Sequence, residues 1–198
     1  MAGEGKSLLE PDEAHEATLV SGMIWRNSDV VIRLEAENVM DQLDVNIDVL
    51  SVQESVNLSM SRWSNCNRVH ITDLNGNKAG NALYDQGYGT LAMNLGIQLV
   101  YFYFNIPVGH PQARILSVTG NISHKDALGD PGSQEYVEDT TRRVAFWRRF
   151  GFQVSDESHP KPFMSAKLGD LRILGGPDTV HGVSRTLSLS TFMPISQP

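Results

Sequence analysis

The stretch Val69-His70-Ile71-Thr72-Asp73-Leu74 is followed by a connection rich in Gly and Asn, then by Gln86-Gly87-Tyr88-Gly89-Thr90 and an apolar run from Leu91. The first segment is typical of a β-strand, and the apolar residues of the last recur at helical spacing: Leu91, Leu95, Leu99 and Phe102. Glycines let the main chain approach phosphate oxygens, and the first N–H groups of a helix point at them. This order of strand, glycine loop and helix therefore predicts a ligand that carries phosphate.

Composition bounds the class of protein. The chain has 198 residues, of which 40% are hydrophobic, enough for one substantial core, and its formal net charge of -7 argues against a surface that binds nucleic acid throughout. Cys66 is the sole cysteine, which excludes an intrachain disulfide and favours a cytoplasmic setting. The start of the chain shows no secretory signal, and polar residues interrupt the longest apolar run, at 91–108, so we expect no membrane span.

Before the central stretch, the sequence predicts antiparallel strands. We expect residues 1–20 to form a polar segment, with a short helix near 11–16, and residues 21–176 to form one domain. Apolar and polar residues alternate through 45–63, as a half-buried sheet requires, and residues 23–25 and 30–34 are also β-like. Residues 35–43 are predicted to form a short helix.

After the central stretch, the pattern predicts a βαβ unit. Residues 113–119 form a strand expected to lie parallel to the Val69 strand, followed by a polar loop over 124–138. Asp139-Thr140-Thr141 is expected to cap a helix from Arg142 to Phe150 that stops at Gly151. Strands are predicted at 152–154 and within 163–174, and residues 177–198 are expected to be an extension that adds an edge strand.

Two segments resemble the GCN5-related N-acetyltransferase (GNAT) family. Tyr84-Asp85-Gln86-Gly87-Tyr88-Gly89-Thr90-Leu91 is similar to its pyrophosphate loop, and Arg143-Val144-Ala145-Phe146-Trp147-Arg148-Arg149-Phe150-Gly151-Phe152 is similar to its later helix, which commonly ends in an aromatic pair followed by Gly-Phe. The resemblance covers about residues 66 to 174. It implies a mixed α/β fold in which helices flank a twisted sheet that splays open between two central parallel strands.

The resemblance also implies a site for acetyl-CoA. The family pattern places the pyrophosphate on the glycine loop and the pantetheine arm beside the central strand, which assigns cofactor binding to Ile71, Thr72, Asp73, Leu74, Gln86, Gly87, Tyr88, Gly89, Thr90, Thr140 and Trp147. Thr140 stands where many members have an asparagine that touches the arm. Trp147 stands where many have the tyrosine that protonates the departing thiolate.

The function implied is transfer of an acetyl group from acetyl-CoA to a primary amine by direct attack. The acceptor is an amine-bearing small molecule or protein, and a homo-oligomer is left open. Backbone N–H groups at residues 71–74 would stabilise the oxyanion, and Asp73, His124 or a water held by them would remove the amine proton. Because an indole N–H is not a practical proton source, Trp147 motivates a second hypothesis: a non-catalytic CoA-binding or protein-interaction module.

Other interpretations of the same residues stay open. The glycines of the loop also fit a tight turn into a buried helix, whereas a dinucleotide site is disfavoured because the glycines do not directly follow the strand. Asp73 also fits a turn cap, and His124 a plain loop histidine. The six histidines, including His70, show no ligand spacing, so no metal site is expected. Four arginines, at 142, 143, 148 and 149, fit a solvated helix face, contacts with CoA phosphates or contacts with an acidic partner.

Overall fold

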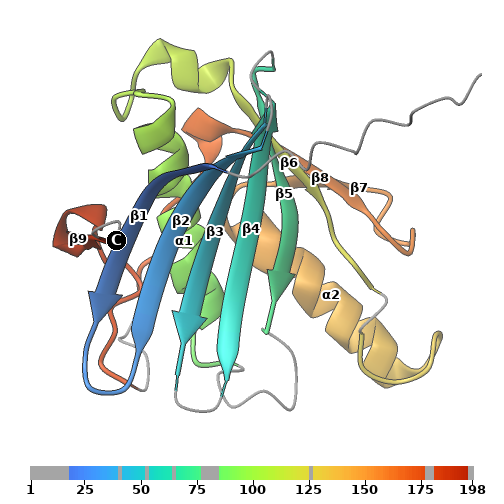
Figure 1. Cartoon of the computed structure of the whole chain (residues 1–198). Coiled ribbons are helices and arrows are strands. Elements are labelled where there is room, and N and C mark those ends of the chain that lie inside the picture. The colour runs from blue at the N-terminus through green and yellow to red at the C-terminus, as the bar shows by residue number, and fades with distance from the viewer. Residues whose placement is uncertain are drawn as a thin grey trace, which may run out of the picture.

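The computed structural model describes residues 18–39, 42–51, 54–63, 66–76, 85–124, 127–176 and 181–195. Within them, nine strands form one mixed sheet in the order β7-β8-β6-β5-β4-β3-β2-β1-β9, and both α-helices lie behind it in the view of Figure 1. The strands are β1 (Thr18–Arg26), β2 (Val31–Val39), β3 (Gln42–Leu50), β4 (Ser55–Trp63), β5 (Arg68–Asn75), β6 (Ser117–Asn121), β7 (Gln153–Ser155), β8 (Phe163–Lys167) and β9 (Met193–Pro194). The helices are α1 (Tyr88–Tyr103) and α2 (Gln134–Arg149). The predicted mixed α/β class is confirmed.

Strands β1 to β5 form an antiparallel meander, as the alternation of residues 45–63 predicted. Buried side chains such as Leu34, Ile47 and Leu58 face the helices, while Asn57 donates to Asp48 at 2.8 Å on the opposite face. The helix predicted for residues 35–43 is wrong. Glu35 pairs with Asn46 and Glu37 with Asp44 in a β-hairpin, because cross-strand pairing and burial of every second residue outweigh a weak local helix preference.

The only parallel pair among the described strands joins β5 to β6, and it is short. It runs from Arg68↔Ser117 to Ile71↔Gly120, so the predicted parallel arrangement is confirmed. On its other edge, β5 stays paired with β4 as far as Asn75, with a bulge at Thr72. Residues 72–75 therefore have a strand neighbour on the β4 side and none in register on the β6 side.

Helix α1 packs against β3 and β4 and is the buried element that the sequence predicted. Twelve of its sixteen residues are buried, and Gly96 lets it approach the sheet closely, because a Cβ there would lie 2.9 Å from Leu58 Cδ2. Phe102 departs from the predicted packing stripe: it lies in the last turn of α1 and is 59% exposed.

Two boundaries after α1 also differ from the predictions. Residues 111–114 form a 3-10 helix, which the pyrrolidine of Pro111 favours, so β6 begins only at Ser117. Helix α2 begins at Gln134, inside the region predicted to be a loop, because the Ser133 hydroxyl caps it by accepting from Tyr136 N–H. The predicted stop at Gly151 is confirmed by its positive φ of 102°.

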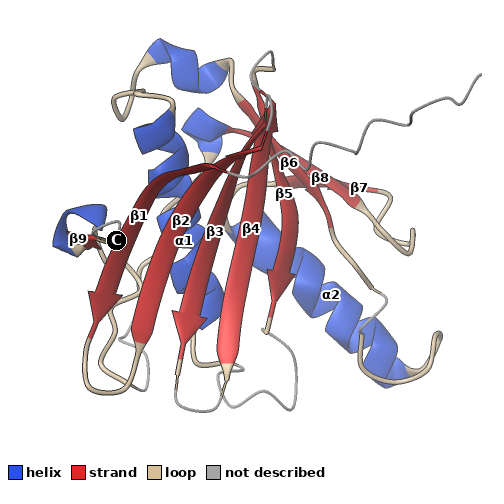
Figure 2. Cartoon of the chain, viewed as in Figure 1, coloured by secondary structure: helices blue, strands red, loops and turns tan. Residues whose placement is uncertain are grey.

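The C-terminal residues return across α1 and add a strand at the far edge of the sheet. Strand β9 pairs with β1 through Met193 and Pro194, within the segment expected to add an edge strand. Asn94, fully buried on α1, holds this return: its amide donates to Leu174 O and Arg185 O, and its carbonyl accepts from Leu174 N. Figure 2 shows the loops of this region beside α1.

Two expectations lie outside the described residues: the short helix near residues 11–16 and the position of Tyr84. None of the helices described is long and apolar enough to cross a membrane.

Replacing Asn94 with Ala should lower the free energy of unfolding by about 1–3 kcal/mol, because two carbonyls and one N–H lose their buried partner. Urea denaturation measures the change. Asn38→Ala, at an exposed position, is the control and should stay within about 0.5 kcal/mol of the unaltered chain. Equal losses of unfolding free energy at the two positions would show that the hydrogen bonds of Asn94 to the C-terminal segment do not stabilise the fold.

Candidate functional site

The first pocket lies where β5 and β6 cease to pair. We call it the inter-strand pocket; it encloses about 780 Å³, counting its open mouth. Its walls are the end of β5, the chain after β6 and one side of α2, and the residues that line it are Ile71, Thr72, Asp73, Leu74, Asn75, Asn121, Ile122, Ser123, Arg142, Arg143, Phe146 and Trp147. The pocket thus includes the edge of β5 that is not in register with β6, where backbone groups can pair with an extended ligand.

The second pocket lies between the glycine loop and α2. This loop pocket encloses about 770 Å³ with its mouth, and it is lined by Asp85, Gly87, Gly89, Thr90, Arg142, Ala145, Phe146 and Arg149. Because Arg142 and Phe146 line both pockets, the two adjoin along α2. Together they form a groove with a free strand edge in one half and a helix N-terminus in the other.

The start of α1 supplies anion-binding groups to the loop pocket. The first bond of the helical ladder runs from Leu91 N to Gly87 O at 3.0 Å, so the N–H groups of Gly89 and Thr90 precede that ladder. Gly87 has φ 89° and Asp85 has φ 57°, which turns the loop into the helix. The positive end of the helix dipole and two guanidinium groups, of Arg142 and Arg149, thus face one cavity.

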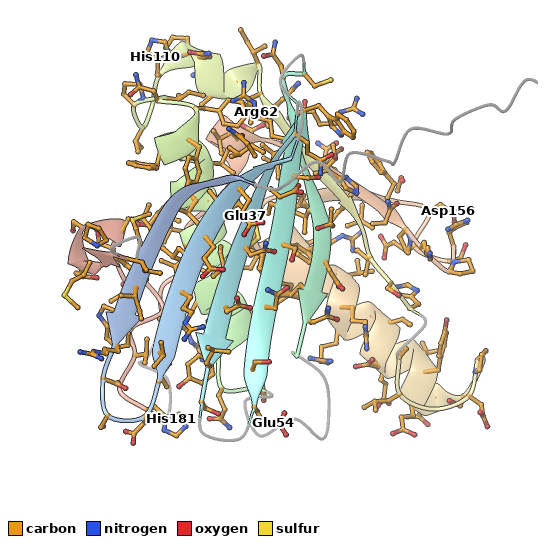
Figure 3. The ribbon with its side chains drawn as sticks, viewed as in Figure 1. Glu37, Glu54, Arg62, His110, Asp156 and His181 are labelled. Carbon is orange, nitrogen blue, oxygen red and sulfur yellow. The ribbon has the colours of Figure 1, made fainter. Side chains whose placement is uncertain are left out.

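The guanidinium of Arg185 covers Gly87 from the C-terminal return. A Cβ on Gly87 would fall on that guanidinium, so glycine is required both for its positive φ and for its lack of a side chain. Arg185 Nε is buried without a hydrogen-bond partner among the described residues. Below the loop, the fully buried Tyr88 stacks on His181 with ring centroids 6.3 Å apart. Figure 3 shows His181 at the opposite end of the sheet from Arg62.

Asp139 orients the arginines that line the inter-strand pocket. It is 5% exposed and accepts from Arg142 Nη2 at 2.7 Å and from Arg143 Nε at 2.8 Å, while Arg143 Nη1 donates to Ser123 O at 3.0 Å. Burial works to raise the pKa of the Asp139 carboxyl, but the hydrogen bonds from Arg142, Arg143 and Leu128 N–H and the charge of Arg143 outweigh it, so the pKa lies below its ordinary value. The carboxylate therefore stays charged at neutral pH.

Aromatic rings close the back of the inter-strand pocket. Trp147 is 7% exposed and meets Phe146 edge to face at 5.1 Å and Phe152 at 5.6 Å. The indole is thus part of the core as well as of the pocket wall, and it brings no hydroxyl to the site.

The predicted site residues fall into three groups. Those that line the inter-strand pocket are Ile71, Thr72, Asp73, Leu74 and Trp147, and those that line the loop pocket are Gly87, Gly89 and Thr90. Gln86, Tyr88, Thr140 and His124 lie outside both linings. Thr140 instead donates its hydroxyl to Tyr136 O at 2.9 Å, within its own helix.

The two residues predicted to remove a proton occupy different surroundings. Asp73 is exposed at the inter-strand pocket and accepts a hydrogen bond from the Asn75 amide. His124 is 5% exposed beside Arg143, and its Nε2 has no hydrogen-bond partner among the described residues. Burial, with a contribution from Arg143, lowers the pKa of the His124 imidazole against the opposing effect of Asp139. His124 is therefore a neutral core histidine at physiological pH.

The site prediction did not include Phe146, and it left Arg142 and Arg149 open between a solvated helix face and contacts with CoA phosphates; these three residues connect the two pockets. Arg142, Phe146 and Arg149 line them from α2, and they are spaced four and three residues apart, which puts them on one helix face. That spacing was visible in the sequence. Asn121, Ile122 and Ser123 could not be assigned in the same way, because only the pairing of β5 with β6 brings them to the pocket.

Comparison with protein-family models, with curated proteins and with solved structures finds no match.

Gly87→Ala tests the crowding at the loop. Both Gly87 and Gly109 have positive φ, 89° and 82°, but a Cβ on Gly109 would meet nothing within 4 Å. We expect Gly109→Ala to cost about 1–2 kcal/mol of unfolding free energy from its backbone conformation alone, and Gly87→Ala to cost more because Arg185 must also move. Urea denaturation of the two variants measures the difference in unfolding free energy. Equal losses would show that the Arg185 side chain moves away from the new Cβ without an energetic penalty.

The lowered pKa of His124 predicts that the stability of the fold depends on pH. Its pKa is lowered in the folded protein, so the unfolded chain takes up a proton first, at about pH 6.5, and the free energy of unfolding falls as the pH drops below that value. His124→Gln should flatten this dependence in urea titrations between pH 7 and 5. Asn38→Ala, at an exposed position, changes no titratable group and is the control, so it should leave the slope unchanged; a slope that persists in His124→Gln would exclude His124 as its source.

Proposed function

We propose that this protein is an acetyl-CoA-dependent N-acetyltransferase that transfers an acetyl group to a primary amine by direct attack. The observation that carries the proposal is the groove itself, in which a loop pocket suited to phosphates adjoins a pocket with a free strand edge. CoA has this same division, with a pyrophosphate at one end of an extended arm. The sheet that opens between β5 and β6 supports the resemblance to GNAT proteins.

The loop pocket would hold the pyrophosphate. The N–H groups of Gly89 and Thr90 would donate to its oxygens, and the guanidinium of Arg149 would add charge-assisted bonds. Asp85 lines the same pocket and opposes an anion there. Arg142 is already paired with Asp139, so the cation that offsets Asp85 is Arg149, and the N-terminus of α1 adds positive potential for an anion.

The inter-strand pocket would hold the pantetheine arm along residues 72–75 of β5. The arm carries amide groups, which can pair with backbone N–H and C=O groups as an added strand would. Phe146 and Trp147 provide apolar surface along one wall. Acetyl-CoA would supply the activated acetyl thioester at the inner end of this pocket, near Ile71, where backbone N–H groups of β5 would stabilise the developing oxyanion.

A non-catalytic CoA-binding module is the second candidate function, and one observation favours it. Trp147 is buried in an aromatic cluster and offers only an indole N–H where a proton source would be needed. A binder would be stabilised by CoA yet release no thiol. Turnover with amines therefore separates the two candidates.

The cofactor assignment predicts different effects at two neighbouring arginines of α2. Arg149→Ala should raise the Kd for CoA about 10-fold or more, because it removes a charge-assisted contact from the loop pocket. Arg148 points elsewhere, pairs with Glu157 and is absent from both pocket linings, so Arg148→Ala is the matched control. Isothermal titration calorimetry measures both; equal affinities would remove Arg149 from the phosphate site.

Thermal-shift titration with CoA and acetyl-CoA tests the proposal as a whole. A ligand bound only by the native state must raise the melting temperature, and stabilisation is expected at millimolar ligand. Thiol release is then measured with polyamines, aminoglycosides and lysine peptides. The absence of any stabilisation would overturn the cofactor assignment, and stabilisation without turnover would favour the binding module.

A further inference from the structure

His70 lies on β5 beside the point where the two parallel strands part, on the face opposite the buried Ile71. It pairs in register with Ser61 on β4 and Thr119 on β6. Both neighbours are small and buried, at 7% and 5% exposure, while His70 itself is half-buried. The imidazole therefore stands between two short hydroxyl side chains and retains access to solvent.

The two contacts of the Thr119 hydroxyl favour one tautomer of the neutral His70 imidazole. His70 Nδ1 lies 3.3 Å from Thr119 Oγ1, and that hydroxyl donates to Val69 O at 3.4 Å. A threonine hydroxyl carries one proton; once it is given to Val69 O, the oxygen can only accept from the imidazole. His70 is then protonated at Nδ1, and the lone pair of Nε2 is left to take a proton.

The bulge at Thr72 places a second polar group on the same face. Ser59 and Ser61 share one face of β4, and they pair with Asp73 and His70 respectively, so these two residues project to the same side although three positions separate them. An exposed carboxylate beside an imidazole suits an amine, which Asp73 can attract as an ammonium ion before His70 takes its proton.

We propose that His70 is the general base of the transfer reaction and that Thr119 is the residue that positions it. This inference rests on the proposed function. The ammonium ion releases one proton to water; the neutral amine nitrogen then forms a bond to the acetyl carbonyl carbon, the carbon–sulfur bond breaks, and a second N–H proton passes to His70 Nε2. The thiolate takes a proton from water, and His70 returns its proton to water, so the products are an N-acetyl amine and a free thiol.

The tautomer is tested first, in the unaltered chain and without any ligand. Two-dimensional NMR of the ¹⁵N-labelled imidazoles, with His70→Gln used to assign the signal, should show His70 protonated at Nδ1 when neutral. Thr119→Val should shift the population toward the Nε2-protonated form, and Thr119→Ser should restore Nδ1. A neutral His70 protonated at Nε2 in the unaltered chain would overturn the inference, whatever the activity.

Kinetics test the base. His70→Gln should lower kcat about 100-fold or more, with the CoA thermal shift unchanged and with partial rescue by added imidazole. Thr119→Val should lower kcat about tenfold, and Thr119→Ser should recover it. His159→Gln is the matched control histidine and should leave kcat unchanged.

The outcomes separate the two proposals. Turnover by His70→Gln within twofold of the unaltered chain overturns the role of His70 and leaves the acetyltransferase intact. CoA binding without turnover by the unaltered chain overturns the transfer reaction and the role of His70 with it. Loss of turnover in His70→Gln and Thr119→Val, with retained CoA binding and the Nδ1 tautomer, supports both.

Discussion

The structure depends on a difference between the two edges of strand β5, which pair with their neighbouring strands over different lengths. On one edge it pairs with β4 to Asn75, through a bulge that absorbs Thr72; on the other it pairs with β6 for only four residues. The backbone of residues 72–75 therefore has no partner in register on the β6 side, and a pocket takes the place of a strand there. Because the unpaired N–H and C=O groups of a strand edge can pair with an added strand, such an edge is a place for an extended ligand.

Helix α2 converts that edge into a groove. Asp139, held between Arg142 and Arg143, orients two cations toward the inter-strand pocket, and the stripe of Arg142, Phe146 and Arg149 continues to the start of α1. Polar groups and aromatic surface thus alternate along one helix face. The same helix carries Trp147 into the core. A substitution at Trp147 would therefore change both the wall of the groove and the packing of the core.

Local sequence patterns predicted most of the elements, and their failures have a common cause. Alternation identified β3 and β4, and leucine spacing identified α1, because burial on one face leaves a period in the sequence. Residues 35–43 are predicted as a helix because Leu34, Val39 and Leu43 could share one helix side, whereas the hairpin places Glu37 opposite Asp44. The start of α2 was missed because Ser133 caps it within a polar stretch that resembles a loop.

The sequence by itself determined the elements that local chemistry specifies: a strand, a glycine loop and a helix in that order, and a second helix with an arginine stripe. Only the tertiary structure decided which of their residues share a site. In the folded chain, Thr140 and His124 lie outside both pocket linings, whereas Asn121 and Ser123 line the inter-strand pocket beside the edge of β5. The Arg185 guanidinium lies against Gly87. The pairing of His70 with Thr119, 49 residues apart, likewise follows from the strand register alone. Such contacts depend on long-range pairing, which leaves no period in the local sequence.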